Sequence, residues 1–242
     1  MTLLHLARLA AQEAGLDFTR YPESSPDYQA FRAFTSASPD VILDVGANDG
    51  GFARQCRRFG FQADIESFEP GSQAFARLAA KAARDPRWNA YRLGLGDRSG
   101  ELTLHVASNA GASSSVLAML PAHQEAAPEA LFVSEETVNV TRLDEWFDVR
   151  RGPWERVALK IDTQGFERQV LDGAGQLIDE NVVSIQLELS LVPLYEGSWL
   201  WDEAAAWLMV RDFRLVGMTP GFSDPATGRL LQFDGVFTRG AA

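Results

Sequence analysis

Four acidic residues of this sequence lie at or near the ends of short apolar runs: Asp44, Glu69, Asp162 and Glu188. Such runs are typical of buried strands in an α/β sheet, whose carboxyl ends form the edge at which ligands bind. A carboxylate at this edge can bind a cation, accept hydrogen bonds from hydroxyl groups or take up a proton. The spacing therefore predicts that these acids meet at one binding site.

A glycine-rich turn follows the first of these acids, in the stretch Asp44-Val-Gly46-Ala47-Asn48-Asp-Gly50. Gly46 and Gly50 let the backbone turn sharply and approach a ligand closely. A dinucleotide fingerprint has glycine where this chain has Asn48, and it binds a pyrophosphate, which the carboxylate of Asp44 would repel. An acid before the turn suits a ligand that carries an amine or a cation. S-adenosylmethionine carries both an α-amine and a sulfonium, so the turn favours this cofactor.

Glu69 and Asp97 are candidates for binding the rest of the cofactor. Glu69 follows Asp44 by 25 positions and precedes Pro70. An acid at this place typically accepts hydrogen bonds from ribose hydroxyls, although a solvated carboxylate at a strand end is the alternative. Asp97 either reaches the adenine edge or belongs to an ordinary polar turn at 96–100.

Asp162 and Glu188 are the catalytic candidates. Asp162 can bind the amino-acid end of the cofactor, orient an acceptor hydroxyl or accept its proton. Lys160 lies two residues before Asp162, so its side chain points to the same side of the strand as Asp162 and can pair with a carboxylate there. An unpaired glutamate is rare in a buried parallel strand, which favours a function for Glu188. A divalent metal held by these carboxylates is an alternative way to activate a hydroxyl, but no ligand spacing requires one.

Histidine and tryptophan offer two further candidates. His123 lies in the long segment 107–134, where it is interpreted as a solvated loop residue, with a role as a base as the alternative. Trp199, Trp201 and Trp207 form either a helix packing face or an apolar acceptor pocket.

The elements that position these residues alternate between strand and helix from Val41 onward. Core strands are expected at 41–45, 61–68, 88–95, 156–161, 182–189, 213–218 and 230–238. Added strands are expected at 101–106 and 136–140, and helices at 51–59, 72–83, 165–171 and 202–210, the last capped by Asp202. A short polar turn joins the last two core strands, so they must be antiparallel. The pattern predicts a mostly parallel sheet closed by an antiparallel hairpin.

The first 38 residues are expected to form an N-terminal helical extension of two helices, followed by a cofactor-binding domain at 39–242. The second of these helices begins at Ser25 and Pro26, with Ser25 as its cap. The extension is interpreted as a lid or packing element, with a contact between two copies of the chain as a further alternative.

Composition limits the class of protein. With 242 residues, 46% of them hydrophobic, the chain can bury a full core. The formal charge of −11 argues against broad binding of nucleic acid, which needs a basic face. The single cysteine, Cys56, rules out an internal disulfide and is expected to be a buried small hydrophobe. No apolar run is long enough to span a membrane and no convincing signal peptide is present, so a cytoplasmic location is the default.

Several stretches together resemble the FkbM-type S-adenosylmethionine-dependent methyltransferases over roughly residues 40–240. The matching pieces are Asp44-Val-Gly-Ala-Asn48-Asp-Gly50, Phe68-Glu69-Pro70, Gly96-Asp97-Arg-Ser-Gly100, Leu159-Lys-Ile-Asp162-Thr-Gln-Gly165-Phe-Glu167, Leu171-x-Gly173-Ala174, Gln186-Leu-Glu188 and Gln232-x-Asp234-Gly235-x-Phe237. The family often has Val-Glu or Val-Asp where this chain has Thr163-Gln164, which removes one carboxylate.

The resemblance implies a Rossmann-like class I methyltransferase fold with seven core strands. It also implies O-methylation of a hydroxyl on a sugar or on a polyketide or other natural-product acceptor. The cofactor-binding residues expected on this basis are Asp44, Gly46, Ala47, Asn48, Gly50, Glu69, Pro70 and Asp97. The alternatives are an NAD(P)-dependent oxidoreductase on a similar fold and a methyltransferase-like binding module without catalysis.

Overall fold

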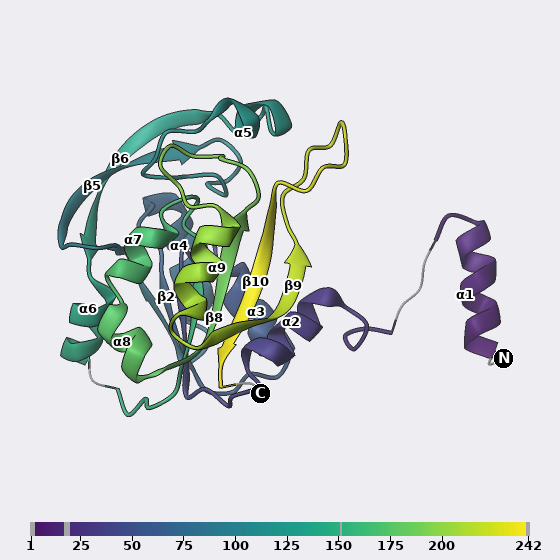
Figure 1. Cartoon of the computed structure of the whole chain (residues 1–242), viewed down its shortest axis with the longest axis horizontal. Helices are drawn as coiled ribbons and strands as arrows, with labels where there is room; N and C mark the ends of the chain where they lie inside the picture. Colours follow the sequence, from purple (N-terminus) through teal and green to yellow (C-terminus); the bar gives the residue numbers. More distant parts are fainter. Residues whose placement is uncertain (1–2, 17–19, 151, 241–242) are drawn as a thin grey trace.

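The structure is a computed structural model that describes residues 3–16, 20–150 and 152–240. A seven-stranded sheet forms its centre, in the order β3-β2-β1-β7-β8-β10-β9 (Figure 1). Its strands are β1 (Val41–Val45), β2 (Asp64–Phe68), β3 (Trp88–Tyr91), β7 (Val157–Ile161), β8 (Val182–Ser190), β9 (Phe213–Pro220) and β10 (Gln232–Arg239). β10 runs antiparallel to both of its neighbours, while the other described pairings are parallel. The expected sheet and its closing hairpin are therefore confirmed.

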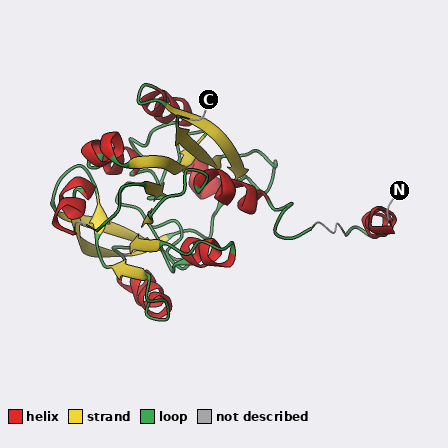
Figure 2. Ribbon diagram, turned by 90° about the horizontal axis from the view of Figure 1, so that it is seen from below, coloured by secondary structure: helices red, strands yellow, loops and turns green. Residues whose placement is uncertain are grey.

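Helices cover both faces of this sheet (Figure 2). One face carries α2 (Pro26–Phe34), α3 (Gly51–Arg58) and α4 (Ser72–Ala82), whose buried side chains pack on Ile42, Ala158 and Val236. The other face carries α6 (Leu143–Arg150), α7 (Glu167–Asp172), α8 (Gly175–Glu180) and α9 (Trp201–Met209). Because both faces are covered, the inner strands are apolar along most of their length.

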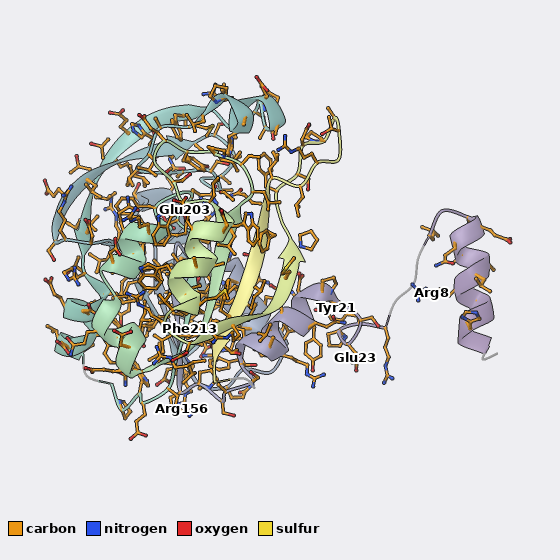
Figure 3. All side chains as sticks on the ribbon, viewed as in Figure 1. Arg8, Tyr21, Glu23, Arg156, Glu203 and Phe213 are labelled. Carbon is orange, nitrogen blue, oxygen red and sulfur yellow. The ribbon has the colours of Figure 1, made fainter. Side chains whose placement is uncertain are left out.

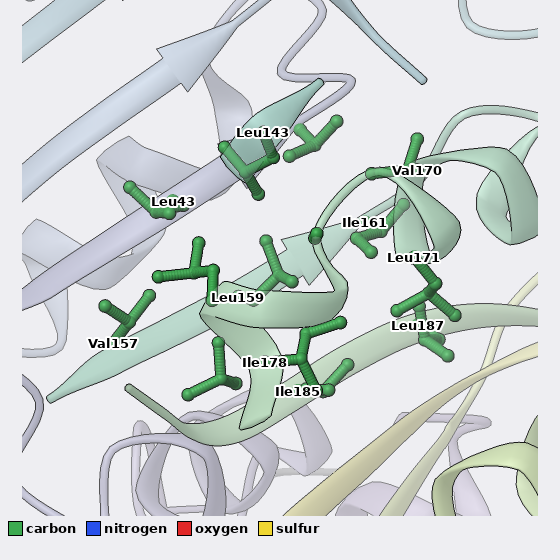
Figure 4. Close-up of a cluster of buried hydrophobic side chains, with 14 of the residues drawn as sticks. Leu43, Leu143, Val157, Leu159, Ile161, Val170, Leu171, Ile178, Ile185 and Leu187 are labelled. Atoms are coloured by element: carbon green, nitrogen blue, oxygen red, sulfur yellow. The ribbon is translucent and has the colours of Figure 1, made fainter. Parts of the chain in front are cut away.

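The core on the second face lies between α7, α8 and the strands β1, β7 and β8 (Figure 4). Val157, Leu159 and Ile161 point into it from β7, and each is fully buried. Full burial of one such side chain stabilises the fold by about 1.5–3 kcal/mol. Alternation along the same strand places Ala158 and Lys160 on the opposite face, toward α2 and α3. This alternation decides which polar side chains share a site.

A smaller sheet lies beside the carboxyl edge of the first. It consists of β4 (Gly94–Leu95), β6 (Phe132–Thr141) and β5 (Gly100–Ala107), in that order. The expected strand 88–95 is therefore two strands in different sheets. The long segment 107–134 is not a simple loop, because it contains α5 (Pro121–Ala126) and the first residues of β6.

The two helices of the N-terminal helical extension differ in how they relate to the core. α1 (Leu3–Glu13) is drawn apart from the sheet in Figure 1, and Figure 3 labels Tyr21 and Glu23 on the segment that leads to α2. α2 begins directly after Ser25, as expected, although the Ser25 side chain makes no capping hydrogen bond. Ala30 and Phe34 of α2 belong to the core, so this helix is part of the packed fold.

One local expectation was wrong in the second half of the chain, and one short helix was not predicted. α9 is capped at Leu200 rather than at Asp202, which lies in the first turn. The helix expected at 165–171 is followed by a second short helix, α8, which the sequence pattern did not indicate. Cys56 is buried, as expected.

Candidate active site

The glycine turn after β1 is held against two neighbouring strands. The backbone N–H groups of Gly46 and Ala47 both donate to the carbonyl of Phe68 at 3.0 Å, at the end of β2. Gly46 has φ of +72°, and a Cβ atom there would lie 1.8 Å from the carbonyl oxygen of Asp162. Only glycine therefore allows the turn and the end of β7 to approach this closely.

Glu69 is fixed by backbone donors on either side of its carboxylate. Asn48 donates its N–H to Oε2 at 2.9 Å, and Gly71 donates its N–H to Oε1 at 2.8 Å. Burial raises the pKa of Glu69 to about 7, against the effect of these two hydrogen bonds. Each carboxylate oxygen can accept a further hydrogen bond. The geometry therefore leaves Glu69 able to accept from two hydroxyl groups of a ligand.

Asp44 lies beneath the turn rather than on its surface. It is 0% exposed, accepts a hydrogen bond from Ser67 Oγ at 3.1 Å, and has Lys160 Nζ 3.4 Å from its Oδ1 atom. Asp44 lines neither of the two pockets that flank the turn. Direct contact between Asp44 and a ligand amine is therefore not what this geometry supports, because strand alternation points the side chain into the sheet face below α3.

Lys160 links Asp44 to the surface of the site. Its Nζ atom lies 3.4 Å from Asp162 Oδ2 and donates to the carbonyl of Gly46 at 3.2 Å. Burial alone would lower the pKa of Lys160, but the carboxylates of Asp162, Asp44 and Asp234 outweigh it and raise the pKa. Lys160 is therefore an ammonium, and its expected pairing with a carboxylate is confirmed.

Asp162 and Glu188 are joined through one amide. The Nε2 atom of Gln164 donates to Asp162 Oδ1 at 2.9 Å and to Glu188 Oε2 at 2.7 Å. Asp162 lines both pockets and its side chain is 33% exposed, whereas Glu188 lines neither. Burial and the nearby carboxylates of Asp162, Glu167 and Asp234 raise the pKa of Glu188 well above its ordinary value. The two catalytic candidates therefore differ: Asp162 faces the site, and Glu188 lies behind it, linked through the Gln164 amide by two hydrogen bonds.

Two residues that sequence reasoning did not assign to the site fix Gln164, one through its side-chain amide and one through its backbone carbonyl. Tyr195 donates its hydroxyl to Gln164 Oε1 at 2.8 Å, so Nε2 must face the carboxylates. Ser115 donates to the Gln164 carbonyl at 2.7 Å, and Gln164 has φ of +54°, an uncommon value for a residue with a side chain. The polar departure from the family pattern at Gln164 was the one signal in the sequence that marked this position.

Two pockets meet at the turn, and both include Gly46, Asn48 and Asp162. The first, which we call the apolar pocket, lies against the small sheet and includes Glu69; its walls also include Phe68, Pro70, Leu95, Leu104, Val140 and Phe166. The second, which we call the polar pocket, lies between α2, α3 and β10; its walls include Asp27, Gln55, Lys160, Gln186, Thr219 and Asp234. Ala47 also lines the polar pocket. Gly50 instead packs below the turn, where a Cβ atom would meet Trp88 and Leu78 at 2.8–2.9 Å.

Several other candidates lie outside this site. Asp97 is exposed beside a separate hollow at the outer edge of the small sheet. His123 is 2% exposed and packs against the ring of Tyr195 at 5.3 Å, so its expected position in solvent was wrong. Trp199, Trp201 and Trp207 line neither pocket; Trp199 and Trp207 pack together around α9, which supports the packing interpretation. Within residues 3–16, 20–150 and 152–240, no group of three or more His, Cys, Asp or Glu residues could hold a metal ion.

The strand order, the glycine turn and the acid that follows β2 together define a class I methyltransferase fold. The model of the methyltransferase FkbM domain matches residues 44–215 of this chain. The chain belongs to the FkbM methyltransferase family, and membership implies S-adenosylmethionine as the cofactor. The oxidoreductase alternative is therefore wrong.

Individual relatives have low sequence identity to this chain. The 2-O-methyltransferase NoeI of Sinorhizobium fredii (strain NBRC 101917 / NGR234) is 28% identical over 165 residues, which cover 66% of this chain and 67% of that protein. A solved FkbM methyltransferase from Methylobacillus flagellatus KT is 15% identical with a TM-score of 0.49; the match covers 81% of this chain but only 43% of the other. An N1-methyltransferase from Burkholderia thailandensis, solved with S-adenosylhomocysteine, is 12% identical with a TM-score of 0.42; the match covers 98% of this chain and 87% of the other.

In the described part of the chain, no helix is long and apolar enough to cross a membrane.

Proposed function

We propose that this protein is an S-adenosylmethionine-dependent O-methyltransferase that acts on a hydroxyl of a sugar or of a natural-product acceptor such as a polyketide. The observation that carries the proposal is the position of Asp162, which faces both pockets at the rim that they share. Its carboxylate is held by Lys160 on one oxygen and by Gln164 on the other. The printed name of the relative NoeI, a 2-O-methyltransferase, supports an oxygen acceptor.

The residues present fit the cofactor. Glu69 has lone pairs left for two ribose hydroxyls, and the apolar walls around Phe68 and Leu95 suit a purine ring. Gly46 leaves no room for a side chain between the turn and Asp162. Asn48 Oδ1 is buried and has no hydrogen-bond partner among the described residues, so it can accept from a ligand amine. When bound, the cofactor supplies a methyl group on a sulfonium, which leaves as a neutral thioether.

Asp162 is proposed to take the proton of the acceptor hydroxyl. A carboxylate within reach of the hydroxyl orients the oxygen and accepts its proton as the new carbon–oxygen bond forms. Lys160 and Gln164 fix the position of Asp162, because each holds one carboxylate oxygen. Glu188 is assigned a positioning role, since it contacts Gln164 rather than the pockets. Correct placement of the acceptor oxygen can supply up to about 7–11 kcal/mol of the barrier reduction.

The decisive test compares Asp162→Asn with Glu188→Gln. Binding of S-adenosylhomocysteine is measured by calorimetry, and turnover by release of S-adenosylhomocysteine on a panel of hydroxylated acceptors. Asp162→Asn should still bind S-adenosylhomocysteine. Its turnover should fall by at least about 100-fold, within the usual range for general acid–base catalysis. Glu188→Gln should lose less. Normal turnover in Asp162→Asn contradicts the assignment, and absence of turnover in the wild-type protein favours a binding module without catalysis.

A further inference from the structure

The strand register gathers polar side chains on one sheet face, outside the residues assigned to the cofactor. Lys160 of β7 pairs with Gln186 of β8 in the parallel register. One step further along, Glu188 of β8 lies opposite Asp234 of β10, and Asp234 lies opposite Thr219 of β9. Because side chains alternate along each strand, these residues share the face that α2 and α3 cover. Gln186, Asp234 and Thr219 line the polar pocket there.

The polar pocket is large enough for a small molecule and lies across the turn from Glu69. Its volume is about 320 Å³, within the size range of ligand pockets. Glu69 and the apolar walls suited to a purine belong to the other pocket. Asp162 stands between the two. A molecule in the polar pocket therefore reaches Asp162 from the side opposite the pocket that contains Glu69.

The charges on its walls are unbalanced. Asp27, Asp49, Asp162 and Asp234 line the pocket, and Lys160 is the one cation among its described wall residues. Lys160 is shared between Asp44 and Asp162, at 3.4 Å from each. Asp49 is bound by Lys81 from outside at 2.6 Å, which leaves Asp27 and Asp234 without a cation of their own on the wall. Such a pocket repels phosphate and carboxylate groups.

The neutral groups on its walls suit hydroxyl groups and a ring. Thr219 Oγ1 has no hydrogen-bond partner among the residues that the structure describes. The amides of Gln55 and Gln186 also line the pocket; Gln55 donates to Asp27 Oδ2 at 2.9 Å and Gln186 hydrogen-bonds to Asp234, which leaves each amide further donor and acceptor positions. Phe31, Phe52 and Phe59 are among the other lining residues. Amides and carboxylates bind hydroxyls in either direction, and an aromatic wall accepts the apolar face of a ring.

We propose that the polar pocket binds the acceptor, and that this acceptor is a neutral or amine-bearing hydroxylated ring without a phosphate or carboxylate group. The proposal rests on the O-methyltransferase function and adds the place and the charge of the acceptor. Asp234 and Thr219 then determine which acceptors bind, while Glu69 and the glycine turn determine cofactor binding.

The test uses three sugars that share one ring and differ in charge: D-glucosamine, D-glucose and glucose 6-phosphate. Binding to the full chain saturated with S-adenosylhomocysteine is measured by saturation-transfer NMR. D-glucosamine should bind several-fold more tightly than D-glucose, and glucose 6-phosphate should give no signal at the same concentration. Equal or tighter binding of glucose 6-phosphate overturns the proposal, and so does absence of binding by all three sugars.

Two variants separate the acceptor pocket from the cofactor pocket. Asp234→Asn should reduce the preference for D-glucosamine over D-glucose several-fold and leave the affinity for S-adenosylhomocysteine unchanged. The control is Asp212→Asn, the same change at an aspartate whose side chain is 86% exposed, outside both pockets. If Asp234→Asn weakens S-adenosylhomocysteine binding tenfold instead, the polar pocket holds the amino-acid end of the cofactor and the proposal is wrong. If wild-type protein fails to bind S-adenosylhomocysteine, the proposed function fails first.

Discussion

Lys160 and Asp44 form a buried ion pair, with Nζ 3.4 Å from Oδ1, in which the lysine side chain is 7% and the aspartate 0% exposed. The pair lies beneath the glycine turn, and Lys160 also donates to the carbonyl of Gly46. Removing one partner of such a pair leaves an uncompensated charge away from water. The pair therefore couples the stability of the sheet to the shape of the turn.

Lys160→Met should destabilise the protein by about 3–5 kcal/mol, because Asp44 would remain buried without its cation. The measurement is urea unfolding followed by circular dichroism. The double variant Asp44→Asn/Lys160→Met should recover part of this loss, since it removes the stranded charge. Equal stability of Lys160→Met and wild type would show that Asp44 does not depend on the pair.

Gly46→Ala should abolish binding of S-adenosylhomocysteine and destabilise the fold, because the new Cβ atom meets the Asp162 carbonyl at 1.8 Å. The matched control is Gly228→Ala, at a glycine with φ of +71° against +72° for Gly46, where a Cβ atom meets nothing within 4 Å. The control should cost only the strain of a left-handed conformation, about 1–2 kcal/mol. Thermal unfolding and calorimetry measure the two effects. Similar losses in both variants would mean that strain alone, rather than the contact with Asp162, explains the need for glycine.

Glu69 should make cofactor binding depend on pH near neutrality. Its pKa is raised by burial to about 7, while backbone donors from Gly71 and Asn48 and the charge of Lys160 oppose the rise and Asp44 adds to it. Ribose hydroxyls donate to the ionised carboxylate, so the affinity for S-adenosylhomocysteine should increase from about pH 6 to about pH 8. Glu69→Gln should bind more weakly and lose this increase, as measured by calorimetry across that range.

The raised pKa of Glu69 has the opposite effect on the stability of the fold, which should decrease rather than increase with pH. Between the ordinary pKa near 4.5 and the folded pKa of about 7, the folded protein holds a proton on Glu69 that the unfolded chain has lost. The contribution of Glu69 to stability therefore falls as pH rises through this window, by at most about 1.4 kcal/mol per pH unit. Relative to wild type, Glu69→Gln should become more stable with rising pH; a constant difference would contradict the raised pKa.

Tyr195→Phe should lower kcat by about 2–12-fold, which corresponds to one net hydrogen bond of about 0.5–1.5 kcal/mol. The reason is that the Tyr195 hydroxyl donates to Gln164 Oε1 and so holds the Gln164 amide between Asp162 and Glu188; phenylalanine has no such donor. Binding of S-adenosylhomocysteine should not change. Tyr21→Phe, at a tyrosine that is 59% exposed, is the control and should leave kcat unaltered. A lower cofactor affinity with normal kcat in Tyr195→Phe would assign Tyr195 to the cofactor pocket instead.

Much of the fold could be predicted because its signals are local. The run Val41–Val45 has the apolar and β-branched residues of a strand buried on both faces, and it forms β1, an inner strand of the sheet between β2 and β7. The polar turn at 220–228 required an antiparallel hairpin, which β9 and β10 form. The segment 107–134 was harder, because its small residues gave no clear period, and packing against Tyr195 and the small sheet buries His123 and orders α5.

Within the site, the glycine turn, Glu69 and the acids at the strand ends could be predicted from the sequence, because turn chemistry and strand ends follow from neighbouring residues. Which of these side chains reach a ligand depends on how distant segments pack together. The face on which a strand residue lies is set by pairing with distant strands, which buried Asp44 against Lys160 and placed Glu188 behind Gln164. Tyr195 and Ser115 joined the site for the same reason: their hydrogen bonds to Gln164 connect residues 31 and 49 positions apart, a separation that no local pattern records.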